Sequence, residues 1–338
     1  MHVSDSAALP RTEAGTASRA GTAVPAVAAG QDVTVRVPAT SANLGPGFDS
    51  LGLAVGLYDT VRVRTSAEPG TLVSISGEGA ATLPTDDTHL VVRTIRETVE
   101  SAGFRLQGLQ LEAENVIPHG RGLGSSASAI VSGVLAGNAL LPAGLRLNAA
   151  ALLDLCSRLE GHPDNVAPAL AGGLAVSWEE EGKFRSVTAP VHADIIPVAA
   201  VPATELSTES ARGLLPAQVP HADAAANSGR AALLIHALSS EPALLPAGTV
   251  DFLHQDYRAA AMAPSAALMK HLRANGIAAV ISGAGPTVMA LAHGAASAQR
   301  AQTLIAEHLE AAESSEFWRV LRLSVDRDGA RVEEHQRY

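Results

Sequence analysis

One segment constrains the fold of this chain more than any other: residues 117–128, which read Ile-Pro-His-Gly-Arg-Gly-Leu-Gly-Ser-Ser-Ala-Ser. Three glycines at alternate positions let the backbone adopt positive φ and approach a ligand without a Cβ in the way. Two serines follow, and the run of small residues behind them predicts a helix. Because a helix N-terminus offers unpaired amide groups and the positive end of a dipole, this junction is typical of a phosphate-binding loop.

The loop differs from two other phosphate-binding motifs. No Gly-Lys-Ser/Thr ends it, as in a P-loop, and no acidic ribose ligand follows it, as in a dinucleotide-binding fold. The alternative interpretation is a turn with a serine N-cap and no ligand. The glycine spacing, the double serine and the helix favour phosphate binding. The residues then expected at the nucleotide are Pro118, His119, Gly120, Arg121, Gly122, Leu123, Gly124, Ser125, Ser126, Ala127 and Ser128.

Around this loop the chain divides into three parts. Residues 1–30 are rich in Ala, Thr, Ser, Gly and Pro without a hydrophobic period, which predicts a disordered tail. Residues 31–188 are expected to form an N-terminal domain and residues 189–330 a C-terminal domain, with the boundary just before a proline-rich region. In the C-terminal part, helices lying among several strands predict an α+β layer with one sheet covered on one face.

Hydrophobic periodicity predicts the individual elements. Strands are expected from Asp32 onward and at 61–64, 195–201, 277–282, 287–291 and 318–325. Helices are expected at 88–101, 125–140, 149–160, 222–239, 265–275 and 295–312. Asp87 or Thr88 is expected to cap the first helix and Asn148 the third. The buried stripe of the third helix is expected to contain Leu152, Leu153, Cys156 and Leu159.

Charge and cysteine content exclude several classes of function. The net charge of -10 and the absence of a Lys/Arg cluster argue against nucleic acid or an anionic membrane as a partner. The single cysteine, Cys156, excludes an intramolecular disulfide and a cysteine-based zinc site, and it is expected in the core, not as a nucleophile. No apolar run approaches the roughly 18–20 residues of a membrane span, and no signal-peptide pattern is present, so a cytoplasmic location is expected.

Three segments together resemble the family of galactokinase, homoserine kinase, mevalonate kinase and phosphomevalonate kinase, the GHMP kinases. The nucleotide loop of that family reads Pro-x-x-x-Gly-Leu-Gly-Ser-Ser, and residues 118–126 match every defined position. Residues 37–49 and 281–288 fit the other two motifs in the expected order. The resemblance implies the two-domain GHMP kinase fold, α+β overall, with an N-terminal α/β nucleotide-binding domain and a C-terminal ferredoxin-like α+β domain. It also implies ATP and Mg²⁺ as cofactors.

Within the family, four segments are similar to the homoserine kinases: residues 38–49, 160–168, 205–212 and 254–258. That branch implies transfer of the γ-phosphate of ATP to the hydroxyl of L-homoserine, giving O-phospho-L-homoserine and ADP in threonine biosynthesis. The expected partners are therefore two small molecules, L-homoserine and ATP. The residues do not decide between a monomer and a homodimer.

Homoserine is a zwitterion, so its pocket needs a cation for the carboxylate and acceptors for the ammonium group. Arg212 and Arg258 match the carboxylate-binding arginines of the family, and the planar fork of arginine suits a carboxylate. A surface ion pair is the alternative for each. The resemblance implies that the other substrate-binding residues are Asn43, Asp49, His162 and Asp164, although Asn43 and Asp49 also fit turn chemistry.

Glu160 ends a predicted helix, where the helix dipole disfavours a carboxylate. The resemblance implies that it binds Mg²⁺ there with Ser126 as the second protein ligand, phosphate and water completing the octahedron. Other branches of the family place an aspartate base where this chain has Asn165. Since an amide cannot act as a base, we expect direct transfer, with Glu160, Asn165 and Ser126 as the catalytic set. The competing hypothesis makes Asp164 the base.

Two rival functions stay open. One is a GHMP kinase for another small alcohol, such as mevalonate or a sugar. The two arginines and the His-Pro-Asp-Asn run at 162–165 argue against it, because mevalonate has no ammonium group to bind. The other is a nucleotide-binding protein without catalytic activity, against which the intact loop and the two expected metal ligands argue. Magnesium-dependent ATP turnover separates these classes.

Overall fold

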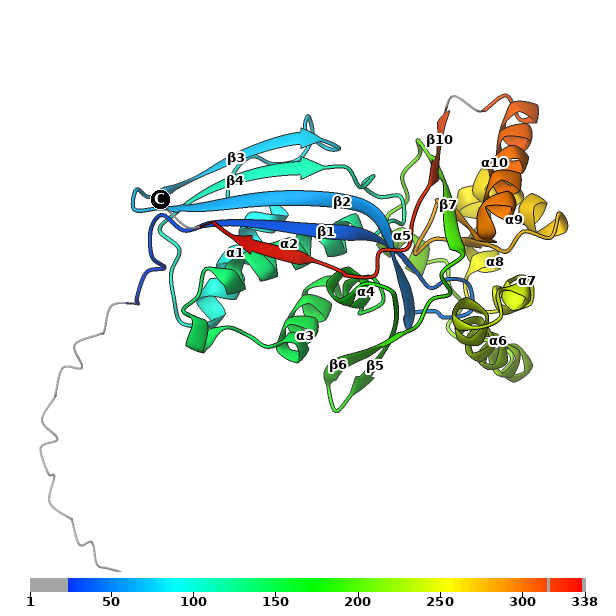
Figure 1. The fold of residues 1–338 in the computed structure, drawn as a ribbon, viewed down its shortest axis with the longest axis horizontal. Coiled ribbons are helices and arrows are strands. Elements are labelled where there is room, and N and C mark those ends of the chain that lie inside the picture. Colours follow the sequence, from blue (N-terminus) through cyan, green and yellow to red (C-terminus); the bar gives the residue numbers. More distant parts are fainter. Residues whose placement is uncertain (1–23, 315–316, 336–338) are drawn as a thin grey trace, which may run out of the picture.

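The computed structural model describes residues 24–314 and 317–335 of the chain. Two β-sheets dominate it, and each carries its own set of helices (Figure 1). This architecture agrees with the predicted two-part α+β fold.

Within the described residues, the first sheet has seven strands. Its main path runs β11-β1-β2-β4-β3, and β5 pairs with the start of β2 and with β6. Among the strands named here, β3 and β4 run parallel and the other pairs are antiparallel. The strands are β1 Asp32–Ala42, β2 Leu51–Ser66, β3 Gly70–Gly77, β4 Gly108–Asn115, β5 Leu174–Glu180, β6 Lys183–Ala189 and β11 Arg331–Glu334.

Helices cover one face of this sheet, as Figure 1 shows. They are α1 Leu90–Ser101, α2 Ser125–Ala139, α3 Ala149–Glu160 and α4 Val166–Ala171. Alternation in the strands explains the arrangement: Val33, Val35 and Val37 of β1 point into the core with α2, while Thr34 and Arg36 point to the other side. The opposite face of the sheet is therefore polar.

The second sheet has four antiparallel strands in the order β10-β7-β9-β8: β7 Ile195–Pro202, β8 Ala279–Ile281, β9 Val288–His293 and β10 Trp318–Arg322. Its helices are α5 Thr208–Arg212, α6 His221–Ser239, α7 Leu245–Gly248, α8 Gln255–Arg258, α9 Ala263–Ala274 and α10 Gly294–Ala311. Short 3₁₀ turns at Ala143–Leu145, Pro242–Leu244 and Ala259–Met262 complete the described elements.

Both faces of the second sheet are covered, so the prediction of one covered face is wrong. Val198 and Ala200 of β7 pack in a core cluster with α9 and α10. Ala199 and Val201 point the other way, into a cluster that contains α6 and residues of β2. Strands buried on both faces carry continuous apolar runs, as β7 does, and such a run does not reveal how many layers cover it.

The N-terminal cap of one predicted helix differs from expectation, and that of another agrees with it. The N-cap of α1 is His89 and no side chain caps this helix; Asp87, one of the predicted caps, instead accepts hydrogen bonds from Thr71 and Arg96. Asn148 does cap α3, as predicted, by accepting from the amide of Ala151 at 3.0 Å.

The predicted tail, residues 1–30, falls mostly outside the described residues. Its last part contacts the fold before the expected start of order at Asp32. Ala26 forms a β-bridge with Arg105, and the side chain of Val27 is 8% exposed within the core of the first sheet.

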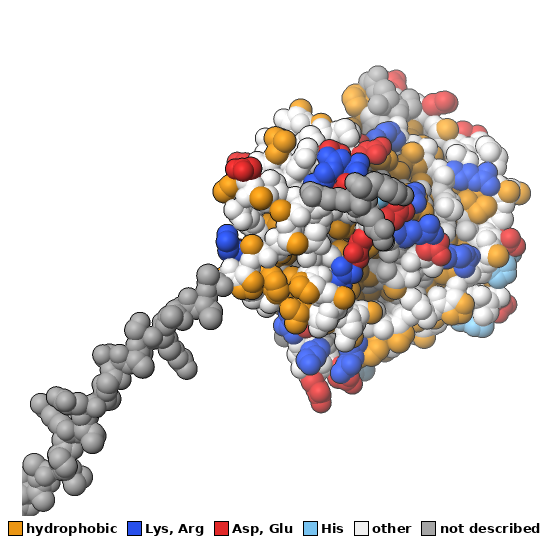
Figure 2. Space-filling view, turned by 60° about the vertical axis from the view of Figure 1, so that its left-hand side comes forward, with side chains coloured by type: hydrophobic (Ala, Val, Ile, Leu, Met, Phe, Trp, Pro, Cys, Tyr) orange, Lys and Arg blue, Asp and Glu red, His pale blue; other side chains and the backbone are white. Residues whose placement is uncertain are grey.

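On the face shown in Figure 2, acidic and basic side chains are intermingled and form no continuous basic surface. This agrees with the negative net charge of the chain. No helix among the described residues is both long enough and apolar enough to cross a membrane.

Candidate active site

The three sequence motifs meet where the two sheets adjoin. Backbone hydrogen bonds join them: the Thr40 amide donates to the Leu123 carbonyl at 3.1 Å, and the Gly283 amide donates to the Ala42 carbonyl at 3.0 Å. The Thr287 amide donates to the carbonyl of Arg121 at 3.3 Å. The glycine-rich loop is therefore held between the end of β1 and the turn that joins β8 to β9.

Two glycines of the loop are required by this close packing. Gly122 has φ +74° and Gly124 φ +72°, in the left-handed region that favours glycine. A Cβ on Gly122 would lie 2.1 Å from the Ser282 carbonyl oxygen, and one on Gly124 would lie 2.1 Å from Thr40 Oγ1. The loop therefore owes its shape to the motifs that contact it as well as to its own sequence.

Behind the loop, α2 begins at Ser125, and Gly124 at its N-cap offers no side-chain acceptor. The first amide groups of the helix consequently have no intrahelical partner and point out of its N-terminus. Together with the helix dipole, these amides suit a phosphate group.

A carboxylate and a hydroxyl face each other beside this N-terminus. Glu160, the last residue of α3, accepts a hydrogen bond from Ser126 Oγ at 2.5 Å. Burial raises the pKa of Glu160 and the charge of Asp164 adds to this, while the Ser126 bond and His162 act in the opposite sense. Desolvation of an anion at a helix C-terminus is unfavourable, and a hard cation bound by these two oxygens would offset it. The donor set therefore fits a magnesium ion.

At the other end of the site, the loop between β1 and β2 is held in a strained conformation. Asn43 and Asp49 have φ of 66° and 54°, which is uncommon for residues other than glycine. Asn43 Nδ2 donates to the Gly283 carbonyl at 2.9 Å, and Asn43 Oδ1 accepts from the Asp49 amide at 3.0 Å. Asn43 and Asp49 therefore stabilise the turn and also lie at the cavity, so the two predicted interpretations hold together.

The two arginines have different surroundings. Arg212, at the end of α5, forms two hydrogen bonds with the Asp49 carboxylate, at 2.7 and 3.0 Å. Arg258, at the end of α8, is 2% exposed, and none of the described residues forms an ion pair with it. Burial, together with the charge of Arg212, lowers the pKa of Arg258, and the charges of Asp49, Asp251 and Asp164 oppose this. A buried cation that has no direct ion-pair partner among the described residues suits an anionic ligand.

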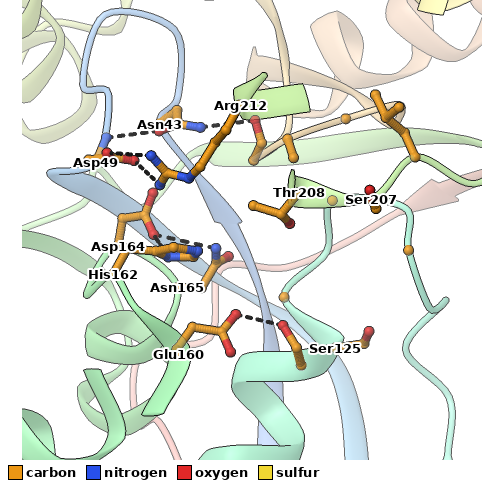
Figure 3. A pocket seen from close by; sticks show the side chains of 18 of the residues that line it. Asn43, Asp49, Ser125, Glu160, His162, Asp164, Asn165, Ser207, Thr208 and Arg212 are labelled. Carbon is orange, nitrogen blue, oxygen red and sulfur yellow. Dashed lines mark hydrogen bonds and ion pairs between the residues drawn. The ribbon is translucent and has the colours of Figure 1, made fainter. Parts of the chain in front are cut away.

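Between these two ends lies a polar cluster (Figure 3). His162 Nδ1 donates to Asp164 Oδ1 at 2.7 Å, and this bond and charge outweigh the effect of burial, so the pKa of His162 is raised. The Thr40 hydroxyl donates to Asn165 Oδ1 at 2.8 Å. The amide NH₂ of Asn165 is left as a donor, 3.5 Å from Asp164 Oδ1.

These groups line one cavity of about 230 Å³. Of the residues predicted from the sequence, it brings together Asn43, Asp49, Gly120, Gly122, Gly124, Ser125, Ser126, Glu160, His162, Asp164, Asn165, Arg212 and Arg258. Figure 3 shows the Asp49–Arg212 pair at one end and Glu160 at the other.

Other residues of the predicted nucleotide loop do not line this cavity: Pro118, His119, Arg121, Leu123, Ala127 and Ser128. Leu123, Ala127 and Ser128 are completely buried in the protein. The side chain of Arg121 donates to the carbonyl of Ala203 and pairs with Glu205. The motif as written in the sequence mixes residues that face the ligand with residues that hold the loop.

The site assignment from the sequence left out two groups of lining residues: Leu206, Ser207 and Thr208, and Gly283, Ala284 and Gly285. Both groups lie inside segments that carried the family resemblance, which was the available signal. The Leu206 amide donates to the Gly120 carbonyl at 2.9 Å, so the first group packs on the glycine-rich loop. Because Leu206 and Gly120 are far apart in the sequence, no local pattern predicts this contact.

Comparison with known proteins gives consistent matches in sequence and structure. The family model "GHMP kinases N terminal domain" matches residues 89–173, and "GHMP kinases C terminal" matches residues 224–311. A homoserine kinase of Streptomyces coelicolor is 53% identical, over 89% of this chain and 94% of its own length. A homoserine kinase of Leifsonia xyli is 50% identical, over 90% and 92%.

Among solved structures, a homoserine kinase of Cytophaga hutchinsonii is similar with a TM-score of 0.79 and 30% identity, covering 89% of this chain and 97% of that one. A mevalonate kinase of L. major is similar in fold with a TM-score of 0.63 and 16% identity, covering 90% and 98%.

Proposed function

This chain belongs to the GHMP kinase family as an ATP-dependent kinase of homoserine, and we propose that the cavity described above is where the transfer takes place. The observation that carries this proposal is Arg258, a buried guanidinium without an ion-pair partner among the described residues. Asp49 and Asp164 line the same cavity and offer the acceptors that an ammonium group requires. A cavity with an unpaired cation and nearby carboxylates suits a small zwitterion better than it suits a sugar.

We assign the substrate contacts accordingly. The substrate carboxylate binds the guanidinium groups of Arg258 and Arg212. The ammonium group binds the carboxylate of Asp49, which also accepts two hydrogen bonds from Arg212. The hydroxyl then lies toward Asp164 and Asn165, between the two ends of the cavity (Figure 3). Asn43 holds this arrangement by fixing the Asp49 backbone.

The residues at the other end hold the triphosphate. The amides at the start of α2 and the glycine-rich loop bind phosphate oxygens. Ser126 and Glu160 would hold Mg²⁺, which supplies charge neutralisation of the phosphates when bound. We also propose a cytoplasmic location, which the single cysteine supports. The proposal includes two domains, at residues 31–188 and 189–330, and the presence of two separate sheets supports this division.

Phosphoryl transfer depends mainly on positioning and electrostatic stabilisation, so a side-chain base is not essential. The Thr40 hydroxyl donates to Asn165 Oδ1, and this bond orients the side-chain amide so that its NH₂ group is available as a donor. Such a donor suits the negative charge that develops during transfer. Asp164 is held by His162 through the 2.7 Å bond. We therefore propose direct transfer, in which the hydroxyl proton leaves late, to phosphate or to solvent.

The Asp164→Asn variant tests this mechanism. Under direct transfer, kcat changes by less than about tenfold while KM for homoserine rises. The reason is that the variant loses a negatively charged contact to the substrate but does not lose a catalytic base. A loss of several orders of magnitude in kcat with little change in KM would make Asp164 the base. Steady-state kinetics with the coupled release of ADP measure both constants.

The Glu160→Gln variant tests the metal assignment. Removing one of two protein ligands weakens Mg²⁺ binding, so the Mg²⁺ concentration at half-maximal activity should rise by about 10- to 100-fold, and chelation by EDTA should abolish turnover in the wild type. Glu209→Gln, at an exposed glutamate of α5 outside the lining of the cavity, is the matched control. An unchanged Mg²⁺ dependence in Glu160→Gln would contradict the assignment.

A further inference from the structure

His254 is a completely buried histidine beside the substrate end of the cavity, and no motif assignment above gives it a role. It precedes α8, its side chain is 0% exposed, and its ring lies 5.2 Å from the ring of Phe48. Its two ring nitrogens contact different partners. Nε2 lies 2.8 Å from the Gly45 carbonyl oxygen, and Nδ1 lies 3.2 Å from Arg258 Nη1.

These partners determine the tautomer of the ring. A carbonyl oxygen only accepts hydrogen bonds, so Nε2 must carry the proton that it donates to Gly45. A guanidinium only donates, so Nδ1 must offer its lone pair to Arg258. His254 is therefore neutral, which agrees with the lowering of its pKa by burial despite the opposing charge of Asp251. The Asp251 carboxylate already accepts from the amides of Leu253, His254 and Gln255.

Among the described residues, the side chain of Arg258 forms hydrogen bonds only with neutral acceptors. Besides His254 Nδ1, its Nε donates to the Ala211 carbonyl at 3.1 Å, and Nη1 lies 3.5 Å from the Gly283 carbonyl. The guanidinium also lies 5.4 Å from the centre of the Phe48 ring. These contacts fix the direction of the guanidinium plane without cancelling its charge, whereas a carboxylate at position 254 would cancel it.

We propose that His254 is a positioning residue: as a neutral acceptor it aims Arg258 at the substrate carboxylate, and through Gly45 it ties Arg258 to the loop that carries Asp49. The same ring thereby links the group that binds the carboxylate with the group that binds the ammonium. This determines the selectivity for an α-amino acid over an alcohol that lacks the carboxylate. The inference rests on the proposed role of Arg258.

Two substitutions separate the two bonds of His254. In His254→Asn the amide reaches the place of Nδ1 and keeps an acceptor for Arg258, whereas in His254→Gln the amide reaches the place of Nε2 and keeps a donor for Gly45. We expect His254→Gln to raise KM for L-homoserine by about tenfold or more, with kcat and KM for ATP within about threefold of wild type. His254→Asn should stay closer to wild type in KM.

The neutral analogue L-homoserinamide tests whether the effect concerns the carboxylate. The preference of the wild type for homoserine over the amide, expressed as a ratio of kcat/KM, should shrink by about tenfold in His254→Gln and be retained in His254→Asn. His293→Gln, a half-exposed histidine at the far end of β9, is the matched control. Equal losses for both substrates, or equal effects of both His254 variants, would reduce His254 to a packing residue and overturn the inference.

A measurement on the wild-type enzyme tests the tautomer of His254 directly. Imidazole ¹⁵N chemical shifts, assigned by difference from His254→Asn or by selective labelling, should show His254 neutral and protonated on Nε2 at pH 7. A doubly protonated ring, or protonation on Nδ1, would overturn the inference. If the wild type does not phosphorylate homoserine, the proposed function of the cavity fails, and that result is distinct from an unchanged substrate preference in His254→Gln.

Discussion

At the scale of single residues, the site concentrates strain in one short loop. Asn43, Leu44 and Asp49 all have positive φ, and no other stretch of the described chain gathers three such non-glycine residues. Each costs free energy that the surrounding contacts must offset, and such residues cluster where geometry serves function. The sequence predicted a bend here from its Asn, Gly, Pro and Asp residues. It did not predict that Asp49 pairs with Arg212, because no local pattern encodes a contact across 163 positions.

Cys156 offers a test at this scale. It lies in the core cluster of the first sheet, and burial raises the pKa of its thiol to about 12. Because the thiolate is the reactive form, we expect no labelling of the folded enzyme by Ellman's reagent at pH 8, and one equivalent of label after denaturation.

Activity should be unchanged after exposure of the native enzyme to the reagent, and Cys156→Ser reports any background reaction. Rapid stoichiometric labelling of the native enzyme with loss of activity would show that Cys156 is accessible and near the site, in contradiction to its place in the core.

At the scale of elements, most long helices could be predicted from their apolar period, and the structure confirms α2, α3, α6, α9 and α10 to within one or two residues at most ends. Their N-caps are less predictable, because other polar groups can form hydrogen bonds with the side chain that would otherwise cap the helix. Asp87 has the chemistry of a cap, but Arg96 and Thr71 bind it instead. Strands β5 and β6 and the short helices α5, α7 and α8 carry weak local patterns and depend on tertiary packing.

At the scale of elements, the glycine-rich loop can be tested through its close contact with the turn between β8 and β9. Gly122→Ala places a Cβ 2.1 Å from the Ser282 carbonyl and forces a side chain into positive φ. The conformation alone costs about 1–2 kcal/mol, and the clash must displace the turn that joins β8 to β9. We expect a lower melting temperature and a loss of ATP affinity of more than about tenfold.

Gly144→Ala is the matched control, because nothing lies within 4 Å of a Cβ at that position and its φ is not in the left-handed region. It should leave both quantities unchanged. Calorimetry with ATP and thermal unfolding measure them, and equal behaviour of the two variants would show that the loop does not depend on its contact with Ser282.

At the scale of the whole molecule, the site exists only because distant parts of the chain meet. The nucleotide loop and Glu160 belong to elements of the first sheet, whereas Arg212, Arg258 and Gly283 belong to elements of the second. The chain also returns at its end, where β11, the red strand in Figure 1, pairs with β1. Glu334 of this strand forms an ion pair with Arg146. The ordered motifs identified the family, but pairings across so many positions follow from the fold and not from local periodicity.

The central claim is that this cavity selects a zwitterionic alcohol and phosphorylates its hydroxyl. Its most direct test is turnover of Mg-ATP with L-homoserine, mevalonate, galactose and L-serine, following both ADP and the phosphorylated product. We expect strong turnover with L-homoserine, and kcat/KM lower by at least about 10³-fold for mevalonate and galactose, since they leave the ammonium acceptors unpaired. Preferred turnover of mevalonate or galactose, or ATP binding without phosphorylation of any of the four, would contradict the claim.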